Sequence, residues 1–286
     1  MNLLSRMTSA GFRPTRGEQT LIDYLMGTYP QGVLESATAI AGHAGISAST
    51  VVRFFGKLGY ASFPDVQREI REEVSARLSS PANRAAAAMG TAQPLKAALE
   101  GAYSHDRTNI ETTYEQLDLR AFDAIVQALT RRGARVSVMA GKNSAPIAAY
   151  LAGHLNMCIP NVRLLQEGPL ILADQLLWTG ADDVLLVVSI RRYSRSILSA
   201  ARHVKEQGGK VLALTDSAVA PVALIADQHL VFRTANTPPF DSFTAAIFLG
   251  NALVSAVATR RGKDLRQTLA RGEALWSEFG VFTEKA

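Results

Sequence analysis

The chain has 286 residues, 48% hydrophobic and 19% charged, with a net charge of +5 and one cysteine, so it is long enough for two domains that each bury a core. No run approaches the ~18 to 20 apolar residues of a membrane span, and the N-terminal stretch MNLLSRMTSAGFRP lacks the features of a secretory signal. These features argue against a membrane or secreted protein, and we expect a cytoplasmic one.

Residues 1–80 predict a helix bundle, because apolar residues recur at spacings of three and four without a strand pattern. We expect one helix that begins at Thr15 and ends before the breakers at 28–32, and three more over 36–44, 47–58 and 64–78. The region holds eight basic and seven acidic residues. A DNA-binding face therefore requires the basic side chains to gather on one side of the bundle.

The second and third of these helices have the features of a helix-turn-helix motif. The second is short and made of small residues, Gly45 permits a tight turn, and Ser47 is placed to cap the third helix. Three-and-four spacing predicts that the third helix buries the face formed by Val51, Phe54, Phe55 and Leu58. The residues that remain for DNA contact are Ser47, Ser49, Thr50, Arg53 and Lys57.

These polar side chains suit the tasks of a recognition helix. Ser49 and Thr50 lie in the first turn, where such a helix meets base edges, and Arg53 one turn later can reach guanine or phosphate. Lys57 is suited to phosphate. Taken singly, each residue fits a plain solvent-exposed helix face equally well, and a bundle of this kind could also serve as a protein-interaction adaptor. The exposed Ser49, Thr50 and Arg53 argue against the adaptor and favour double-stranded DNA as the partner.

The stretch 81–94 divides the chain. It is rich in alanine, begins and ends with proline and lacks an amphipathic period, so we interpret it as a linker between a DNA-binding domain over 1–80 and a second domain over 95–286. Beyond it, after two helical patterns, five apolar runs alternate with helices, at 135–140, 162–166, 183–189, 210–215 and 229–233. This alternation predicts an α/β three-layer sandwich with a parallel sheet, which binds ligands outside the carboxyl ends of its strands. Cys158, in an apolar stretch, is expected to be a buried structural thiol.

The sequence SASTVVRFFGKLGYASFPDV, from Ser47 to Val66, resembles the signature of the RpiR (MurR/RpiR) family of transcriptional regulators. The resemblance implies that the third helix of an all-α helix-turn-helix bundle is the recognition helix. It also implies that the second domain is a sugar-isomerase (SIS) domain that senses a sugar phosphate, and that repression is the default mode of control. We further expect a homodimer or homotetramer whose two-fold symmetry matches a palindromic operator.

In SIS domains the loops after the first and third strands bind the phosphorylated sugar. Here these loops are AGKNS and SIRRYSR, and both depart from the family pattern, because cationic side chains replace glycines and hydroxyls. Arginine can clamp a carboxylate or a phosphate, so we expect a small anionic effector, either a sugar phosphate or a sugar acid. The alternative is a vestigial pocket whose arginines form salt bridges at a subunit interface. The candidate ligand-binding residues are Lys142, Asn143, Ser144, Ser189, Arg191, Arg192, Tyr193 and Ser194, with Glu167 and Ser242 as secondary candidates.

The competing hypothesis is a SIS-type sugar-phosphate isomerase, which needs a proton-transfer base. Neither loop contains a carboxylate or a histidine, and His154, His203 and His229 fall in helices or at a strand start, where packing or solvent contact is the simpler role. An isomerase would also leave the helix-turn-helix motif unexplained. We therefore expect a regulator and not an enzyme, with no catalytic residue, no metal and no cofactor.

Overall fold

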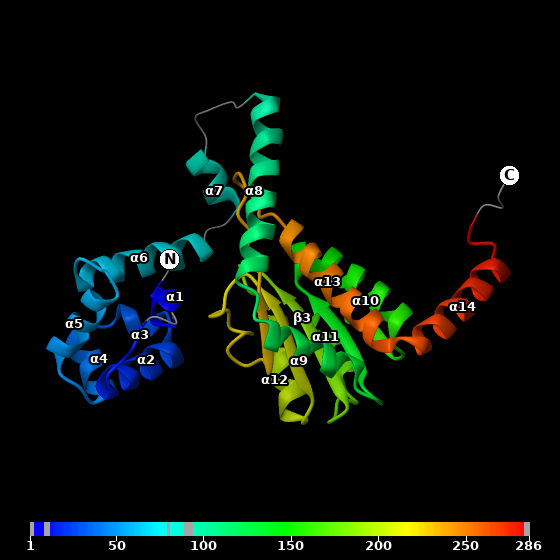
Figure 1. The fold of residues 1–286 in the computed structure, drawn as a ribbon, viewed down its shortest axis with the longest axis horizontal. Helices are drawn as coiled ribbons and strands as arrows, with labels where there is room; N and C mark the ends of the chain where they lie inside the picture. The colour runs from blue at the N-terminus through cyan, green and yellow to red at the C-terminus, as the bar shows by residue number, and fades with distance from the viewer. Residues whose placement is uncertain (1–2, 9–11, 79–80, 89–93, 283–286) are drawn as a thin grey trace. The chain divides into compact units, whose positions relative to one another are not determined.

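The computed structural model of the chain describes residues 3–8, 12–78, 81–88 and 94–282. The chain divides into two units, Met1–Ser79 and Ser80–Ala286, which Figure 1 colours along the sequence. No helix within the described ranges is long and apolar enough to cross a membrane.

The first unit is all-helical in its described part. It consists of α1 (Leu3–Met7), α2 (Arg16–Thr28), α3 (Gln31–Leu34), α4 (Ala37–Ala44), α5 (Ala48–Lys57) and α6 (Phe63–Leu78) (Figure 1). The four longer helices lie where the apolar periodicity predicts them, and they share a core in which Leu25, Ile40, Phe54 and Ile70 are fully buried. α2 begins with a capping box, in which Thr15 and Glu18 each accept a hydrogen bond from the other's backbone N–H.

The turn between α4 and α5 has the geometry of a helix-turn-helix. Gly45 ends α4 with φ at 65°, in the left-handed region that favours glycine. The N–H of Ile46 donates to the carbonyl oxygen of Ala41 at 3.0 Å, which closes the end of α4. Ser47 then caps α5, since its side chain accepts a hydrogen bond from the N–H of Thr50.

The second unit contains a five-stranded sheet with the strand order β2-β1-β3-β4-β5, and every neighbouring pair is parallel. Valine and leucine side chains fill the interior of β3, which is buried along its whole length. The strands are β1 (Arg135–Ala140), β2 (Val162–Leu164), β3 (Asp183–Ser189), β4 (Lys210–Thr215) and β5 (Gln228–Val231).

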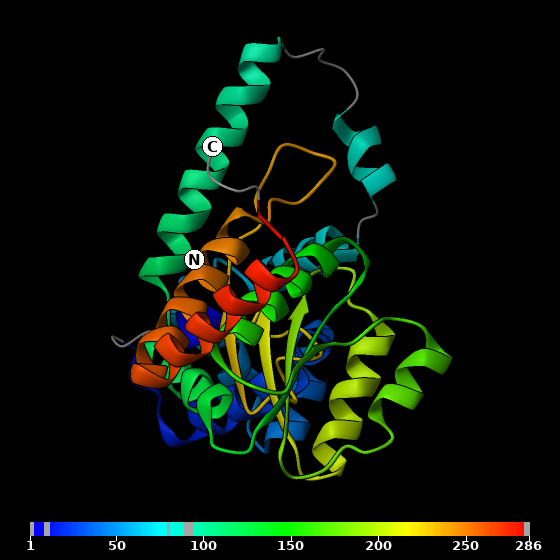
Figure 2. The same ribbon diagram turned by 90° about the vertical axis from the view of Figure 1, so that its right-hand side faces the viewer.

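Helices cover both faces of this sheet, which gives the three-layer sandwich that the sequence predicts (Figure 2). α9 (Leu119–Thr130), α10 (Ala145–Cys158) and α13 (Thr244–Arg261) pack on one face. α11 (Pro169–Leu176) and α12 (Arg195–Glu206) pack on the other. Cys158 is buried in the first of these layers, as expected.

Three further helices complete the described part of this unit: α7 (Pro81–Ala88), α8 (Leu95–Glu115) and α14 (Lys263–Glu278). α7 falls where the sequence suggested a linker without regular structure. Its alanines have a high helix propensity, but eight residues are too few for periodicity to identify a helix from the sequence. The remaining part of the proposed linker, residues 89–93, lies outside the described residues.

Candidate functional site

The exposed face of α5 is a candidate DNA-binding surface. Val51, Phe54 and Phe55 are fully buried, as their spacing predicts, so the opposite side of the helix is held outward. At its N-terminus the hydroxyl oxygen of Ser47 lies 2.9 Å from that of Ser49 and 2.8 Å from that of Thr50. Ser47 and Ser49 are exposed and Thr50 is half-buried. The first turn of α5 therefore presents a cluster of hydroxyl groups.

One turn later the same face carries Arg53 and a residue that sequence reasoning missed, Val52. Arg53 is exposed, and its Nε donates to the carbonyl oxygen of Ser49 at 3.3 Å. Val52 is 46% exposed although it is apolar. It lies three residues after Ser49, so helical spacing could have placed it on the exposed face. An apolar side chain at this position can contact the methyl group of thymine.

Lys57 lies at the edge of this face and already has a partner. Its Nζ forms an ion pair with the carboxylate of Glu18, whose side chain is almost fully buried. The backbone N–H of Thr15 also donates to this carboxylate, at 2.7 Å. Burial raises the pKa of Glu18, but the hydrogen bonds from Lys57 and Thr15 outweigh burial and lower the pKa below its ordinary value. Lys57 thus neutralises a buried carboxylate, whatever further contact it makes.

The two loops predicted to bind the effector lie at the carboxyl ends of β1 and β3, which are neighbouring strands. Lys142, Asn143 and Arg192 are exposed there, whereas Ser144 and Ser189 are buried. The hydroxyl of Ser144 donates to the carbonyl oxygen of Gly141 at 2.8 Å, so it holds the loop itself.

Glu167, from the loop after β2, bridges these two loops. Its Oε1 accepts from the hydroxyl of Ser194 at 2.7 Å, and its Oε2 accepts from the backbone N–H of Lys142 at 3.2 Å. The approach is close enough that a Cβ on Gly141 would lie 3.3 Å from the Cβ of Ser194. The donors of the two loops therefore hold a carboxylate of the protein itself.

Arg191 is not a free cation. Its Nε donates to Oδ1 of Asp241 at 2.8 Å, and its Nη2 contacts the same oxygen. Its backbone N–H donates to Asp216 at 3.2 Å, and the hydroxyl of Tyr193 donates to the same carboxylate at 3.1 Å. Asp216 follows β4, in a loop that the sequence analysis did not assign to the site. Asp241 follows β5 and directly precedes Ser242, which the sequence analysis named as a secondary candidate.

Ser242, a secondary candidate for ligand binding, makes contacts within the protein instead. Its hydroxyl donates to Asp106 of α8, and its N–H donates to the carbonyl oxygen of Thr234 at 3.1 Å. It therefore ties α8 to the loop before α13.

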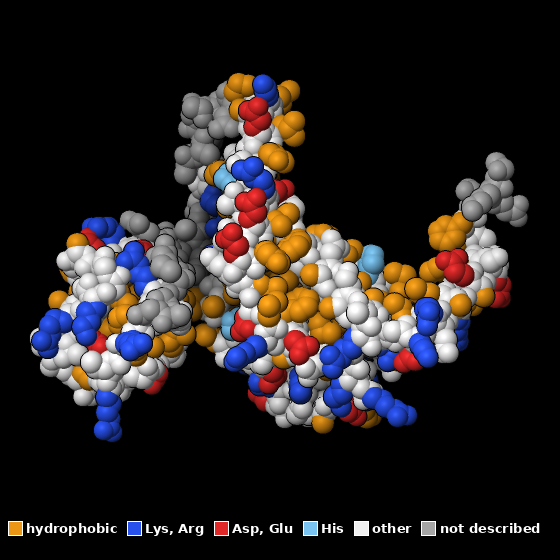
Figure 3. Space-filling model, viewed as in Figure 1, with side chains coloured by type: hydrophobic (Ala, Val, Ile, Leu, Met, Phe, Trp, Pro, Cys, Tyr) orange, Lys and Arg blue, Asp and Glu red, His pale blue; other side chains and the backbone are white. Residues whose placement is uncertain are grey.

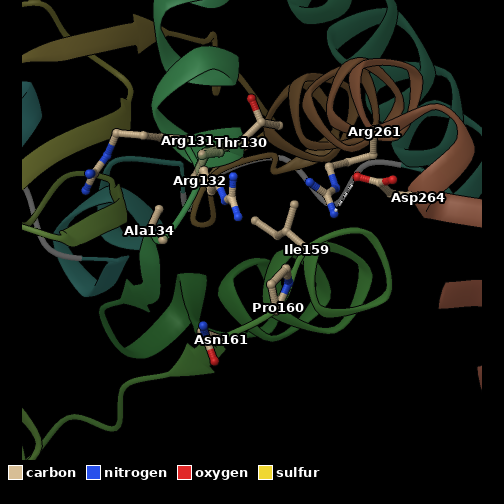
Figure 4. Close-up of a pocket in the computed structure, with 11 residues that line it drawn as sticks. Thr130, Arg131, Arg132, Ala134, Ile159, Pro160, Asn161, Arg261 and Asp264 are labelled. Atoms are coloured by element: carbon tan, nitrogen blue, oxygen red, sulfur yellow. Dashed lines mark ion pairs between the residues drawn. The ribbon is translucent and has the colours of Figure 1, made fainter.

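A separate pocket lies at the opposite, amino-terminal edge of the sheet, with a cavity volume of about 480 Å³ (Figure 4). In Figure 4 the side chains of Arg132 and Arg261 point towards one another above Ile159, and Arg261 forms an ion pair with Asp264 at 3.3 Å. Doubly wound sheets bind ligands at the other edge, where the strands end at their carboxyl termini. We therefore place the candidate effector site at the loops and not in this pocket.

Two histidines that were weighed as possible proton-transfer bases, His154 and His229, have surroundings of their own. Nδ1 of His154 lies 2.9 Å from the carbonyl oxygen of Tyr150, one turn earlier on α10. Burial lowers the pKa of His229, against a smaller opposite effect of Asp118. Among the described residues no group of His, Cys, Asp and Glu could hold a metal ion. Glu167, Asp216 and Asp241 nevertheless bring three carboxylates to the loops, although neither loop sequence contains one.

Two family models match separate parts of the chain. The helix-turn-helix domain of the rpiR family matches residues 1–77, and the SIS domain matches residues 128–256. The sugar isomerase domain of an RpiR transcription factor from Sphaerobacter thermophilus is 30% identical with a TM-score of 0.59, over 64% of this chain and 99% of that one.

Two further proteins are similar over most of their length. An uncharacterized HTH-type transcriptional regulator from Clostridium perfringens is 24% identical over 249 residues, which are 83% of this chain and 84% of that protein. The Vibrio vulnificus NanR protein, solved in complex with ManNAc-6P, shares the fold with a TM-score of 0.56 at 17% identity, over 99% of this chain and 100% of that chain.

Proposed function

The chain belongs to the rpiR family of helix-turn-helix transcriptional regulators, and from this premise we propose that it binds an operator through α5 under the control of a small anionic effector. The exposed face of α5 is the observation that carries the proposal. Hydroxyl groups in the first turn, with Val52 and Arg53 one turn later, offer hydrogen-bonding, apolar and cationic contacts to a major groove. Ser47, Ser49, Thr50 and Arg53 are the proposed DNA-binding residues, with Lys57 directed to phosphate.

The proposed effector is a sugar phosphate or a sugar acid bound at the loops after β1 and β3. The Lys142 amide and the Ser194 hydroxyl already hold the carboxylate of Glu167, so these donors suit an anionic group. An effector that uses them displaces Glu167. NanR, which shares the fold, was solved with the sugar phosphate ManNAc-6P, and this supports the same class of ligand here. Asn143, Ser144, Ser189, Arg191, Arg192 and Tyr193 are the other proposed members of the site.

We propose a homodimer or homotetramer that binds a palindromic operator as a repressor. Large apolar side chains on α8 and α14 remain exposed, and Figure 3 shows hydrophobic side chains along α8 and near the end of α14. Burial of such surfaces between two copies would stabilise the assembly. Effector binding changes operator affinity if the ligand prefers one arrangement of the recognition helices, and a coupling of ~1 to 3 kcal/mol is enough for control.

The second candidate function is a sugar-phosphate isomerase, and the carboxylate of Glu167 between the two loops is the observation that favours it. A carboxylate beside a bound sugar could act as a proton-transfer base. The helix-turn-helix unit has no role in such an enzyme, so the regulator is the better explanation of the whole chain.

The test uses the full chain. Selection from a random pool of DNA duplexes should return a palindromic sequence, and failure to enrich any duplex would contradict the regulator. Thermal melting is then measured against sugar phosphates, sugar acids and dicarboxylates, because a ligand at 100 times its Kd adds ~2.7 kcal/mol of stability. Ser194→Ala should abolish a specific shift, and Ser199→Ala, on the exposed side of α12, should retain it. Turnover of a stabilising sugar phosphate, followed by NMR, would instead support the isomerase.

A further inference from the structure

Two arginines from distant parts of the second unit share one carboxylate. Nη1 of Arg84, on α7, lies 3.1 Å from Oδ1 of Asp241, and its Nη2 lies 3.4 Å from Oδ2. Nε of Arg191, in the loop after β3, lies 2.8 Å from Oδ1 of the same residue. The three side chains are largely buried, with exposed fractions of 15% for Arg84, 22% for Arg191 and 10% for Asp241.

The hydrogen bonds of this cluster are incomplete. Nε of Arg84 is buried and has no hydrogen-bond partner among the described residues. A buried donor without an acceptor is unfavourable, and it is more so on a charged group. Arg84 uses both terminal nitrogens on Asp241, so an additional acceptor has to approach from the Nε side. An anion placed there would meet the guanidinium group of Arg84, and such groups bind carboxylate and phosphate through paired hydrogen bonds.

The cluster also links the effector loop after β3 to the first two helices of the second unit. Arg84 belongs to α7, the first helix after the N-terminal unit, and Arg191 to the loop after β3. The residue next to Asp241, Ser242, bonds to Asp106 of α8, and Thr244 donates to the same carboxylate at 2.7 Å. One short segment thus holds both α7 and α8 beside an effector loop.

We propose that Arg84 is part of the effector site, where the anionic group of the ligand joins Arg84 to Arg191 while Asp241 keeps the two guanidinium groups in place. This inference rests on the proposed function and adds to it a residue from the connecting helix. The ligand fastens α7 to the SIS domain, so occupancy of the effector site is transmitted to the segment that leads to the helix-turn-helix. The anionic group is a phosphate or a carboxylate.

The experiment measures the melting temperature of the full chain in inorganic phosphate, in acetate and in chloride at equal ionic strength. We expect phosphate or acetate to raise the melting temperature of the wild type above its value in chloride, and the more effective anion identifies the group. Arg84→Ala should lose this shift, whereas Arg202→Ala, which removes an exposed arginine of α12, should keep it. Arg84→Lys should retain only part of it, because lysine lacks the paired donors.

A second measurement follows proteolysis of the chain. The stabilising anion should slow cleavage near α7 at least twofold in the wild type and have no effect in Arg84→Ala. Equal shifts in Arg84→Ala and wild type, or a wild type that responds no differently to the three anions, would overturn the inference. Arg84→Ala should fold, because Asp241 retains Arg191 as its partner, and circular dichroism checks this. The test involves no DNA, so its failure is distinguishable from a failure to bind an operator.

Discussion

Arg53 is the side chain of α5 best placed to read a base, because it is exposed and its guanidinium lies along the first turn of the helix. We expect Arg53→Ala to weaken binding of a selected operator by ~1 to 3 kcal/mol in a gel-shift titration. The matched control is Arg68→Ala, which removes an exposed arginine of α6 that pairs with Asp65. Equal losses of operator affinity in the two variants would show that Arg53 contributes only its positive charge and does not read a base.

The ion pair between Lys57 and Glu18 joins the recognition helix α5 to α2 and should stabilise the first unit. Loss of Lys57 leaves the buried Glu18 carboxylate without its cation, so Lys57→Met should destabilise the unit by about 1 to 3 kcal/mol in urea unfolding. The double variant with Glu18→Gln should recover part of this loss. An additive effect of the two changes would show that the ion pair does not stabilise the unit.

The lowered pKa of Glu18 gives the same pair a pH dependence. A carboxylate whose pKa is lower in the folded state contributes stability above its unfolded pKa, and this contribution is lost as the pH falls through the folded pKa. The urea concentration at the unfolding midpoint of the wild type should therefore decrease as the pH is lowered below about 4.5. Glu18→Gln should fall less steeply, and an unchanged slope would contradict the assignment.

The pKa of His229 is also lowered, but this residue affects stability at a higher pH than Glu18 does. Burial lowers its pKa in the folded state, so the unfolded chain binds the proton more readily. Its contribution to stability is complete above about pH 6.5 and is lost as the pH falls from there towards the folded pKa. We expect His229→Gln to remove part of the decline in urea midpoint between pH 7.5 and 5. A decline as steep in His229→Gln as in the wild type would contradict the assignment.

The N-terminus of α5 is capped by a single hydroxyl group, so the stability of this helix can be tested with one substitution. Ser47 accepts the N–H of Thr50 at 3.2 Å, and loss of an N-cap of this kind costs ~1 kcal/mol. Ser47→Ala should lower the urea midpoint of the first unit, followed by circular dichroism. Ser49→Ala removes a neighbouring hydroxyl without removing the cap and should leave the midpoint nearly unchanged. Equal midpoints in Ser47→Ala and wild type would contradict the capping role.

The strands show which elements local sequence can define. β1, β3 and β4 have the bounds that the apolar runs predict, because these central strands are buried on both faces and their interiors are mostly apolar. β2 and β5 are the edge strands, and both end two residues before the predicted run does. An edge strand has a neighbouring strand on one side only, so an apolar residue there can be buried without pairing in the sheet. The apolar run therefore extends beyond the end of the strand.

At the scale of the whole molecule, the exposed apolar side chains of α8 predict self-association. Leu95, Leu99 and Tyr103 follow one another at spacings of four residues, and Leu99 is 72% exposed. If this stripe is buried between copies, Leu99→Glu should shift the mass measured by light scattering towards the monomer. Thr108→Glu adds a charge on another, exposed side of the same helix and should leave the assembly intact. A monomeric wild type at micromolar concentration would exclude the proposed homodimer and homotetramer.

The sequence by itself determined the family, the helix-turn-helix with its buried and exposed faces, and the parallel sheet, because each is encoded in short-range spacing and in local turn chemistry. Only the tertiary structure decided the state of the charged side chains at the effector loops. Arg191 looks like a free clamp in the sequence, but Asp241 binds it from 50 residues away, and Glu167 bridges two loops from a third. Contacts of this kind depend on which loops the sheet order brings to one edge, and no local pattern records that order.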